Sequence, residues 1–175
     1  MNPARWSPRR VHTLDDTQID QLAGVLIDCV EGGASVSFMH PLAHDRAVAF
    51  WRRVAHGVAA GERALLVAED AEGLCGTVQL VLDQPENQPH RAELSKMLVH
   101  RRVRRQGLGA ALMRAAEATA RECGKTLLVL DTASEDAERL YERLGWIRVG
   151  VIPGFALLPQ GRLCGTTVFY RTLGG

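Results

Sequence analysis

The sequence predicts a single domain of mixed α/β class, in which two helices precede the main β-sheet. Its 175 residues, 46% of them hydrophobic, are enough to bury a core, so one domain is expected over residues 1–175. Short Val- and Leu-rich segments alternate with segments whose apolar residues recur at helical spacing. No repeat, low-complexity tract or linker interrupts this order, which indicates one mixed sheet flanked by helices.

The N-terminal third predicts a short strand near Val11 and then two helices. Asp15 or Asp16 is a suitable N-cap for the first helix, and its apolar residues recur at helical spacing as far as Gly32 and Gly33, which are typical of a helix end. Residues 34–42 predict a loop. Residues 43–60 predict the second helix.

The remainder of the chain predicts six strands and two more helices. The strands are expected at residues 64–69, 74–82, 92–99, 126–131, 146–151 and 166–172, and the helices at about residues 110–123 and 135–144. The first two of these strands should form a hairpin, and a Pro- and Gly-containing loop should separate the last two.

The nearly equal numbers of positive and negative side chains argue against partners that bind through a large net charge. Lys and Arg total 21 against 20 Asp and Glu, so neither nucleic acid nor an anionic membrane is an expected partner. Residues 1–6 lack the apolar core of a signal peptide, and no apolar run approaches a membrane span. A cytoplasmic protein is therefore expected.

No metal site is expected either. The four cysteines show neither CxxC pairing nor zinc-like spacing, so reduced and mostly buried thiols are predicted. His40 and His44 are four residues apart, but Pro41 makes a single helix through both improbable, which argues against a metal-binding pair.

The most informative segment is a strand, a basic glycine turn and a helix in succession between Leu94 and Arg114. Gly107 and Gly109 let the backbone approach a ligand closely, and the first turn of the following helix offers unpaired N–H groups at the positive end of its dipole. Arg104 and Arg105 add local positive charge. A pyrophosphate is the expected occupant.

We call this glycine turn and the start of the following helix the cradle. The spacing of its glycines and basic residues distinguishes among the protein families that bind phosphate groups in this way. There is no GxxxxGK[ST] phosphate loop, and a GxGxxG dinucleotide fingerprint fails because Leu112 stands at its third glycine. Arg104-x-x-Gly107-x-Gly109 instead resembles the (Arg/Gln)-x-x-Gly-x-(Gly/Ala) pyrophosphate loop of the GNAT superfamily of N-acetyltransferases. The alternative is a basic surface turn before a glycine-containing helix.

Residues 137–146 also resemble this superfamily, in its tyrosine-bearing helix and the glycine–aromatic turn that follows. The resemblance extends over nearly the whole chain to one branch, the tabtoxin-resistance acetyltransferases. The segments that carry this closer resemblance are residues 32–39, 91–94, 130–132, 148–150, 153–155, 161–163 and 172–174. The resemblance implies a GNAT fold with about seven strands and about four helices, splayed between the fourth and fifth strands. It also implies acetyl-coenzyme A as co-substrate and a homodimer.

The same resemblance implies which residues hold the acyl donor. They are the strand residues Met97, Leu98 and Val99 and the loop residues Arg104, Arg105, Gln106, Gly107, Leu108 and Gly109. The alternation of the strand breaks at residues 97–99, which is compatible with the β-bulge that splays the sheet in this family. Backbone N–H groups near Met97 and Leu98 are then expected to bind the thioester oxygen.

Two carboxylates are the expected proton acceptors, because an alkyl ammonium must lose a proton before it attacks a thioester. Glu93 lies on the strand before the cradle, and Asp131 lies at the C-terminal end of the next strand, where open α/β sheets place their ligands. The resemblance points to the same pair. The alternative is that Glu93 binds the acceptor ammonium while Asp131 only caps the following helix.

A phenol near the sulfur can protonate the coenzyme A thiolate as it leaves, and the resemblance assigns that role to Tyr141. The alternative is a half-buried packing tyrosine. For the acceptor, Ser35 and Phe38 in the loop of residues 33–39 and Phe155 are expected to line the pocket, although that loop would also serve as an ordinary helix connection.

The expected function is acetyl transfer to the amine of a small amino-acid-like molecule, such as a toxin or antibiotic. The tabtoxin-like pattern weakens at Phe155, where a tyrosine would be expected, and through residues 156–160, so the acceptor differs if this loop borders it. Two alternatives stay open: a protein or peptide N-acetyltransferase, and a non-catalytic acyl-CoA-binding sensor.

Overall fold

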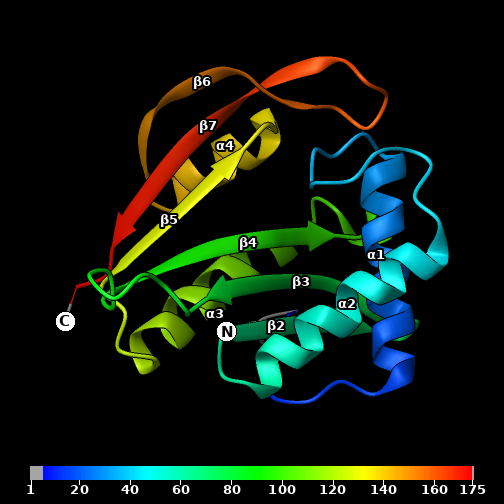
Figure 1. The fold of residues 1–175 in the computed structure, drawn as a ribbon, viewed down its shortest axis with the longest axis horizontal. Helices are drawn as coiled ribbons and strands as arrows, with labels where there is room; N and C mark the ends of the chain where they lie inside the picture. The colour runs from blue at the N-terminus through cyan, green and yellow to red at the C-terminus, as the bar shows by residue number, and fades with distance from the viewer. Residues whose placement is uncertain (1–5, 175) are drawn as a thin grey trace.

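The protein folds around one mixed seven-stranded sheet (Figure 1), seen here in a computed structural model that describes residues 6–174. Its strands are β1 (Arg9–Val11), β2 (Arg63–Asp70), β3 (Gly73–Val81), β4 (Arg91–Val99), β5 (Leu127–Thr132), β6 (Ile147–Leu157) and β7 (Leu163–Thr172). The helices are α1 (Asp16–Glu31), α2 (His44–Ala59), α3 (Leu108–Glu122) and α4 (Glu135–Arg143), with a 3₁₀ turn at Arg101–Val103. The strand order is β1-β2-β3-β4-β5-β7-β6, and only β4 and β5 pair in parallel. The predicted mixed α/β class is confirmed.

The sequence predicts that residues 1–6 do not form a signal peptide. Residues 1–5 lie outside the described residues. Within residues 6–174, no helix combines the length and apolar character needed to cross a bilayer.

Local sequence signals set the ends of α1. The Asp15 side chain accepts a hydrogen bond from the Gln18 amide, and the Gln18 side chain accepts one from the Asp15 amide, which makes a reciprocal capping box. Gly32 closes the C-terminal end. Helix α1 thus begins and ends where the sequence predicts.

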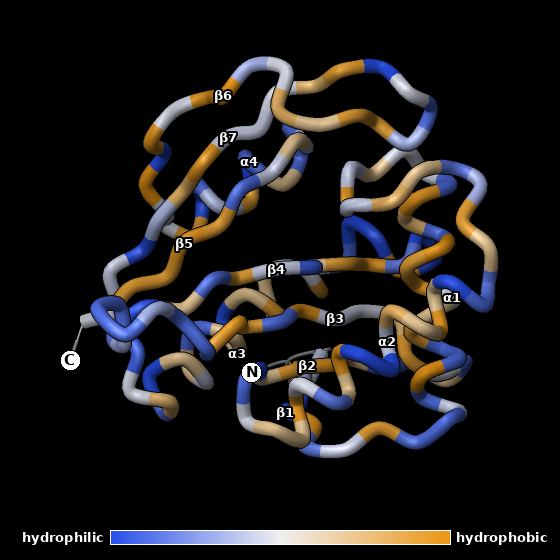
Figure 2. The backbone as a smooth tube through the Cα atoms, viewed as in Figure 1, coloured by the Kyte–Doolittle hydropathy of each residue, from blue (hydrophilic) through white to orange (hydrophobic). Residues whose placement is uncertain are grey.

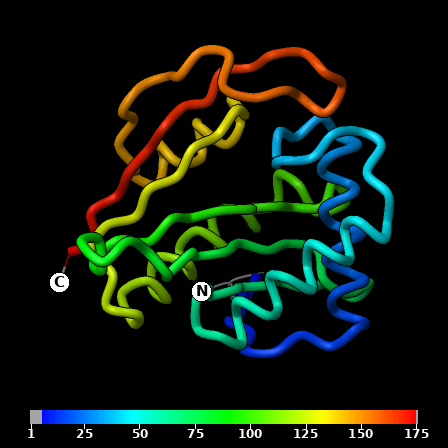
Figure 3. Tube along the Cα trace, viewed as in Figure 1, coloured from blue at the N-terminus to red at the C-terminus, as the bar shows by residue number. Residues whose placement is uncertain are grey.

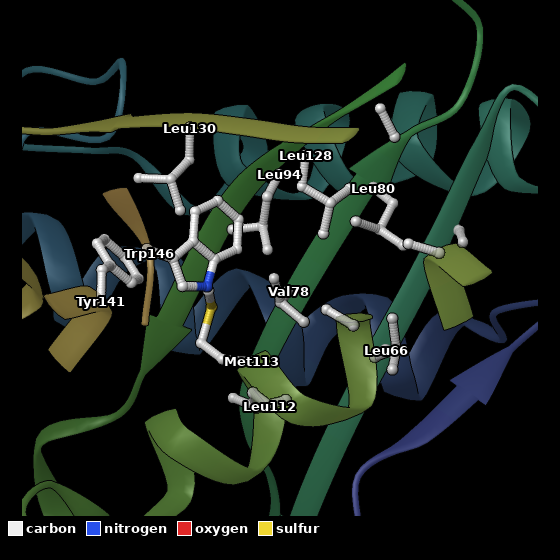
Figure 4. Packing of buried hydrophobic residues seen from close by; sticks show 14 of the residues in the cluster. Leu66, Val78, Leu80, Leu94, Leu112, Met113, Leu128, Leu130, Tyr141 and Trp146 are labelled. Atoms are coloured by element: carbon white, nitrogen blue, oxygen red, sulfur yellow. The ribbon is translucent and has the colours of Figure 1, made fainter. Parts of the chain in front are cut away.

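The alternation of side chains along the strands creates two separate cores, one on each face of the sheet. Leu65 and Val67 of β2 face α1 and α2, where Trp51 is fully buried, while Leu66 faces α3 on the opposite side. Figure 4 shows that second core, with Met113 of α3 close to Trp146 among the leucines of the central strands. The sheet is therefore covered on both faces around its first four strands.

Strands β4 and β5 separate soon after they begin. Their parallel pairing covers only residues 91–93 of β4, level with Leu127 to Val129 of β5, and Figure 1 shows the two strands diverging from that point. The predicted splay between the fourth and fifth strands is confirmed.

A β-bulge in β4 accompanies the splay. Ser95 pairs with Gln79 and Leu98 with Thr77, so Lys96 and Met97 together lie opposite the single residue Val78. Lys96 has a left-handed backbone, with φ of 50°. One extra residue moves the side chains that follow it to the opposite face of the sheet. Leu94 therefore packs against α3, whereas Leu98 packs in the α1/α2 core.

The last hairpin differs from the sequence expectation. The strand expected to end at Val151 continues through Pro153 and Gly154 to Leu157, and its partner begins at Leu163. The register with β7 shifts between Ile152 and Ala156, so Pro153 and Gly154 lie in an irregular stretch between regularly paired residues. Proline is tolerated there because β6 is an edge strand, whose outward N–H groups need no ladder partner.

Candidate active site

The glycine turn forms an anion cradle at the start of α3. Gly107 is the N-cap, with φ of 84°, and no side chain caps the helix. The first helical hydrogen bond runs from the Ala111 amide to the Gly107 carbonyl, so the amides of Leu108, Gly109 and Ala110 have no partner within the helix. These N–H groups at the positive end of the dipole suit a phosphate group.

The two glycines of the motif act in different ways. Gly107 adopts a left-handed turn that a side chain would strain, although a Cβ there would meet nothing within 4 Å. A Cβ on Gly109, by contrast, would lie 3.0 Å from a methyl group of Leu140 on α4. Gly107 therefore shapes the cradle, while Gly109 permits α4 to pack closely against it.

The arginines before the cradle divide into those paired with a carboxylate and those without a carboxylate partner. Nε of Arg101 donates to Asp28 of α1 at 2.7 Å, and Arg102 makes two hydrogen bonds of 3.0 Å to Asp70. Arg104 donates to the Val99 carbonyl at 3.0 Å, and within residues 6–174 neither Arg104 nor Arg105 has a carboxylate partner. The paired arginines fix the loop, and the other two arginines keep their charge for an anion.

The predicted acyl-donor residues on β4 lie along the edge that β5 leaves unpaired. Leu98 and Val99 pair with Thr77 and Gly76 of β3, and beyond Glu93 no described strand pairs with the other edge. Met97 approaches the cradle, since its methyl group lies 3.9 Å from the position of a Cβ on Gly109. This open edge continues the cradle with a row of backbone groups, which suits an extended amide-containing chain.

Glu93 and Asp131 project from the same face of the sheet. Glu93 is level with Val129 in the parallel pairing, and Asp131 lies two residues further along β5, so all three side chains share one face. Ala92 and Leu130 point to the opposite, buried face. The structure thus brings the two predicted carboxylates to one side of the splay, and both are exposed.

Asp131 is held by the neighbouring strand. Thr166 Oγ1 of β7 donates to Asp131 Oδ2 at 2.6 Å, an interaction that sequence reasoning missed. The alternative that Asp131 caps the following helix is wrong, because Ser134 is the N-cap of α4 and accepts from the Ala137 amide at 3.3 Å. Its second carboxylate oxygen is left to the open face.

Tyr141 combines a packed ring with an unpartnered hydroxyl. The ring centroid lies 5.7 Å from that of Phe169 and 6.0 Å from that of Trp146, in the core shown in Figure 4, and the residue is only 4% exposed. Its hydroxyl has no hydrogen-bond partner within residues 6–174. Burial, and then the negative charge of Asp131, raise the pKa of Tyr141 well above 10. The phenol therefore stays protonated at neutral pH.

A cleft of about 290 Å³ lies beside Asp131. Its walls include the three predicted acceptor-site residues, Ser35, Phe38 and Phe155. Residues of the loop between α1 and α2 and of the β6–β7 hairpin line it, and Figure 3 shows these two segments approaching each other. The His40 amide of the loop donates to the Pro159 carbonyl of the hairpin at 3.0 Å. The loop is thus more than a helix connection, because it forms one wall of the cleft.

Sequence reasoning missed Lys96, which lies at the bulge beside this cleft. Its Nζ donates to Ser37 Oγ at 3.1 Å and lies 5.8 Å from the centroid of the Phe50 ring. The signal that could have found it is its place in the strand, since Lys96 interrupts the apolar positions Ala92, Leu94 and Leu98.

Polar side chains that suggested other chemistry have ordinary partners. His44 Nε2 lies 2.7 Å from Asp20 Oδ1, so it forms an ion pair or hydrogen bond rather than a site with His40. The part of the chain from residue 6 to residue 174 contains no cluster of three or more His, Cys, Asp or Glu side chains arranged to hold a metal. Cys29 and Cys75 are buried free thiols, whereas Cys123 and Cys164 are only partly buried.

Known proteins share this architecture. The model of the acetyltransferase (GNAT) family matches residues 32–146. Among solved structures, yncA of Salmonella typhimurium, with its cofactor acetyl-CoA, has 20% identity and a TM-score of 0.77 over 98% of this chain and 95% of its own. A phosphinothricin acetyltransferase of Sinorhizobium meliloti in complex with acetyl-CoA has 17% identity and a TM-score of 0.78, covering 97% and 89%.

A ribosomal-protein-alanine N-acetyltransferase of Brucella melitensis is similar to the same degree, with 19% identity and a TM-score of 0.79 over 95% of this chain and 99% of its own. At these identities the structural likeness establishes the fold, with its splayed sheet, and the family model establishes the relationship. The chain belongs to the acetyltransferase (GNAT) family.

Proposed function

We propose that the chain transfers an acetyl group from acetyl-CoA to the amine of a small amino-acid-like molecule. The observation that carries this proposal is the cleft of about 290 Å³ beside Asp131, at the open face of the splayed strands that lead to the cradle. A cleft of that size suits an acceptor of amino-acid or dipeptide dimensions. Phosphinothricin acetyltransferases among the structural neighbours support a small acceptor, and toxin or antibiotic resistance of the tabtoxin type is the finer form of the proposal.

The residues of the cradle fit the acyl donor. The free amides at the start of α3, with Arg104 and Arg105, would hold the pyrophosphate, and the open edge of β4 at Met97, Leu98 and Val99 would hold the extended arm. When bound, acetyl-CoA supplies an activated acetyl thioester. The residues Gln106, Leu108 and the glycines complete the turn by their backbone conformation.

Glu93 and Asp131 would remove the proton of the acceptor ammonium, directly or through water. Asp131 borders the cleft and is oriented by Thr166, so it is the carboxylate nearer to the acceptor, and Glu93 lies on the same face one strand away. Positioned proton transfer of this kind contributes on the order of 10²–10⁴ in rate. Tyr141, which burial keeps protonated, would donate a proton to the departing thiolate.

A protein or peptide acceptor is the second candidate, supported by the likeness to a ribosomal-protein-alanine N-acetyltransferase. The hydrogen bond from the His40 amide to the Pro159 carbonyl joins the loop and the hairpin that line the cleft. A polypeptide that passed between the loop and the hairpin would need that contact to open. The small acceptor is therefore favoured, and a non-catalytic sensor is disfavoured because it has no need of Asp131 and Tyr141.

The test is a thiol-release assay with acetyl-CoA against amino acids, dipeptides, β-lactam amino acids, aminoglycosides and peptides, with mass spectrometry of the products. Turnover of an amino-acid-like amine, with the acetyl group on nitrogen, is expected. Turnover of peptides alone would favour the second candidate. Tight acetyl-CoA binding without turnover would favour a sensor, and a failure to bind acetyl-CoA would refute the proposal.

We also propose that the protein acts as a cytoplasmic homodimer, without nucleic-acid or membrane partners. The β6–β7 hairpin carries seven exposed large apolar side chains, among them Val149 and Leu163, each 65% exposed, and Figure 2 shows apolar segments along it. Strand β6 is also a sheet edge. A second copy of the same hairpin would cover an apolar edge in a self-complementary way.

A further inference from the structure

Two of the three non-glycine residues with left-handed backbones in the described chain touch each other, and one of them, Ser37, lines the cleft. Lys96 has φ of 50° and Ser37 has φ of 75°, and Lys96 Nζ donates to Ser37 Oγ at 3.1 Å. Such conformations are costly for residues with side chains, and they cluster at functional sites where the surrounding structure holds them. The contact therefore joins two strained positions from segments far apart in the sequence.

The Lys96 ammonium lies near both positively and negatively charged side chains, but it forms no ion pair with any described residue. Burial, and then Arg63, lower the pKa of Lys96, while the negative charges of Asp131 and Glu93 raise it. Both carboxylates are thus near enough to act on the ammonium, yet neither lies within 4.0 Å of Nζ, and Ser37 Oγ is its only hydrogen-bond acceptor within residues 6–174. A partly buried ammonium has three donors, so its desolvation is offset by one hydrogen bond only.

This arrangement is complementary to a zwitterion. We propose that Lys96, steadied by Ser37, binds the carboxylate of the acceptor, while Asp131 and Glu93 receive its ammonium; the acceptor is then an amino acid or an analogue with a free carboxylate. The inference rests on the proposed function, because it names the acceptor class of the same cleft. Lys96 is a specificity-determining residue in this account, and it takes no part in proton transfer.

The geometry favours this role over simple charge neutralisation. A lysine that only offset the two carboxylates would approach one of them, as Arg101 approaches Asp28 at 2.7 Å elsewhere in the chain. Instead the bulge turns the side chain toward Ser37, which itself lines the cleft. The remaining donors of Nζ are then available to an acceptor oxygen.

Kinetics with matched acceptors separate binding of the carboxylate from a structural role. Each amino acid or dipeptide that is acetylated is compared with its methyl ester, which keeps the amine and removes the negative charge. The wild type should show a KM for the acid lower by about tenfold to a hundredfold, which corresponds to one charge-assisted hydrogen bond. In Lys96→Met that preference should vanish, with the acetyl-CoA affinity and the KM for the ester unchanged.

Two further variants serve as checks. Ser37→Gly keeps the left-handed backbone without strain and removes the hydroxyl, so it should weaken the acid preference less than Lys96→Met does. Lys125→Met makes the same substitution at a lysine whose Nζ donates to the carbonyls of Leu82 and Pro89, outside the cleft, and should leave the preference intact. An equal loss for acid and ester in Lys96→Met would overturn the inference.

A second measurement does not depend on turnover. Lys96 and Lys125 are the only lysines in the sequence, so protein labelled with ¹³C at the lysine ε-carbon gives two side-chain signals. With coenzyme A present, amino acids and dipeptides should shift the Lys96 signal, their methyl esters should not, and the Lys125 signal should stay in place. If no acid shifts the Lys96 signal, the inference fails even where amines are acetylated; if acids shift it but none is acetylated, the proposed activity fails instead.

Discussion

Tyr141 shows how one residue can belong to the core and also present a group suited to the proposed chemistry. Its ring packs between Phe169 and Trp146, so the backbone and ring position are fixed by burial, while its hydroxyl has no partner within residues 6–174. Because the environment raises its pKa, the phenol is a weak acid that stays loaded with a proton. That is the state a general acid needs before the leaving thiolate forms.

Tyr141→Phe removes the hydroxyl and keeps the packed ring. Turnover is expected to fall on the order of 10²-fold, the lower end of what general acid catalysis supplies, while acetyl-CoA affinity and thermal stability stay close to wild type. Steady-state kinetics, with acetyl-CoA binding measured by calorimetry, check this. The wild-type rate should show no loss of this acid as the pH rises to 10, because a raised pKa keeps the phenol protonated across that range.

The chain offers an informative comparison, since Tyr170 is the only other tyrosine. Tyr170 lies on β7, level with Val129, on the same sheet face as Asp131. If Tyr170→Phe lost turnover and Tyr141→Phe did not, the phenol that supplies the proton would be the other one.

At the residue scale, the sequence predicts the side chains that follow a motif and misses those that depend on distant contacts. The positions of Glu93 and Asp131 on two neighbouring strands followed from the predicted strands, while their role stays a prediction. Lys96 was not, because its role depends on a left-handed backbone and on Ser37, which lies 59 positions away. Thr166 was missed for the same reason, since its contact with Asp131 spans 35 positions.

At the scale of elements, a glycine with a left-handed backbone lies at each end of α3, but only the one at the N-terminal end belongs to the cradle. Gly107 begins the helix with φ of 84°, and Gly124 follows it with φ of 73°; a Cβ would meet nothing within 4 Å at either position. Gly107→Ala and Gly124→Ala should therefore each destabilise the protein by about 1–2 kcal/mol, the cost of a left-handed alanine. Urea unfolding measures both losses.

Only the first substitution should affect the cradle. Gly107→Ala is expected to weaken acetyl-CoA binding by roughly tenfold, because relief of the strain moves the amides of Leu108 and Gly109. Gly124→Ala should bind acetyl-CoA as the wild type does. Equal affinities in the two variants would show that the turn at Gly107 does not hold the pyrophosphate.

The contact between α1 and the cradle loop is another element-scale feature, and it is sensitive to pH. Burial raises the pKa of Asp28, but the backbone and side-chain hydrogen bonds from Arg101 and the charge of His100 outweigh it, so the net shift is downward from 3.8. A depressed folded-state pKa stabilises the fold above the unfolded-state value, and the stabilisation is lost as the pH falls through the folded-state value.

Asp28→Asn should lower the free energy of unfolding at neutral pH by about 1–3 kcal/mol, because it removes a charged acceptor that is itself buried, although its partner Arg101 is half exposed. The difference from wild type should shrink as the pH falls below 3.8 and through the still lower folded-state pKa, below which the wild-type carboxyl is also neutral. Glu31→Gln is the control, since Glu31 also meets Arg101, at 3.4 Å, but both side chains are half exposed, and such pairs contribute little. Urea titrations across this pH range would contradict the account if the two variants behaved alike.

Element boundaries were predictable where local chemistry sets them and less so where pairing does. The capping box at Asp15 and the glycine at position 32 fix α1 locally, and the prediction holds. The last hairpin is longer than predicted because β7 pairs with β6 on both sides of Pro153 and Gly154. Those residues usually end a strand, and only the edge position with its register shift lets the strand continue.

At the scale of the whole molecule, the splay divides the protein into a well-covered sheet and a projecting hairpin. Helices cover both faces of the first four strands, whereas the β6–β7 hairpin extends beyond them (Figure 1) with an exposed apolar surface. Met39 is the only exposed large apolar residue outside this hairpin among those described, and it lies in the cleft. The apolar surface is thus concentrated on one element, which also forms part of the cleft through Phe155 and Leu157.

The proposed homodimer predicts that light scattering on the eluting protein gives twice the mass of one chain. A double substitution, Val149→Asp with Leu163→Asp, should give the mass of a single chain, because two buried carboxylates in each copy would oppose association. The change Ala118→Asp, on the exposed side of α3, adds a carboxylate away from the hairpin and should leave the dimer intact.

Since Phe155 and Leu157 border the cleft from the same hairpin, the single-chain form should keep its acetyl-CoA affinity but show a raised KM for the acceptor. A wild type that elutes as one chain would remove the need for a partner copy, and the apolar hairpin would then have to be explained by the acceptor cleft alone.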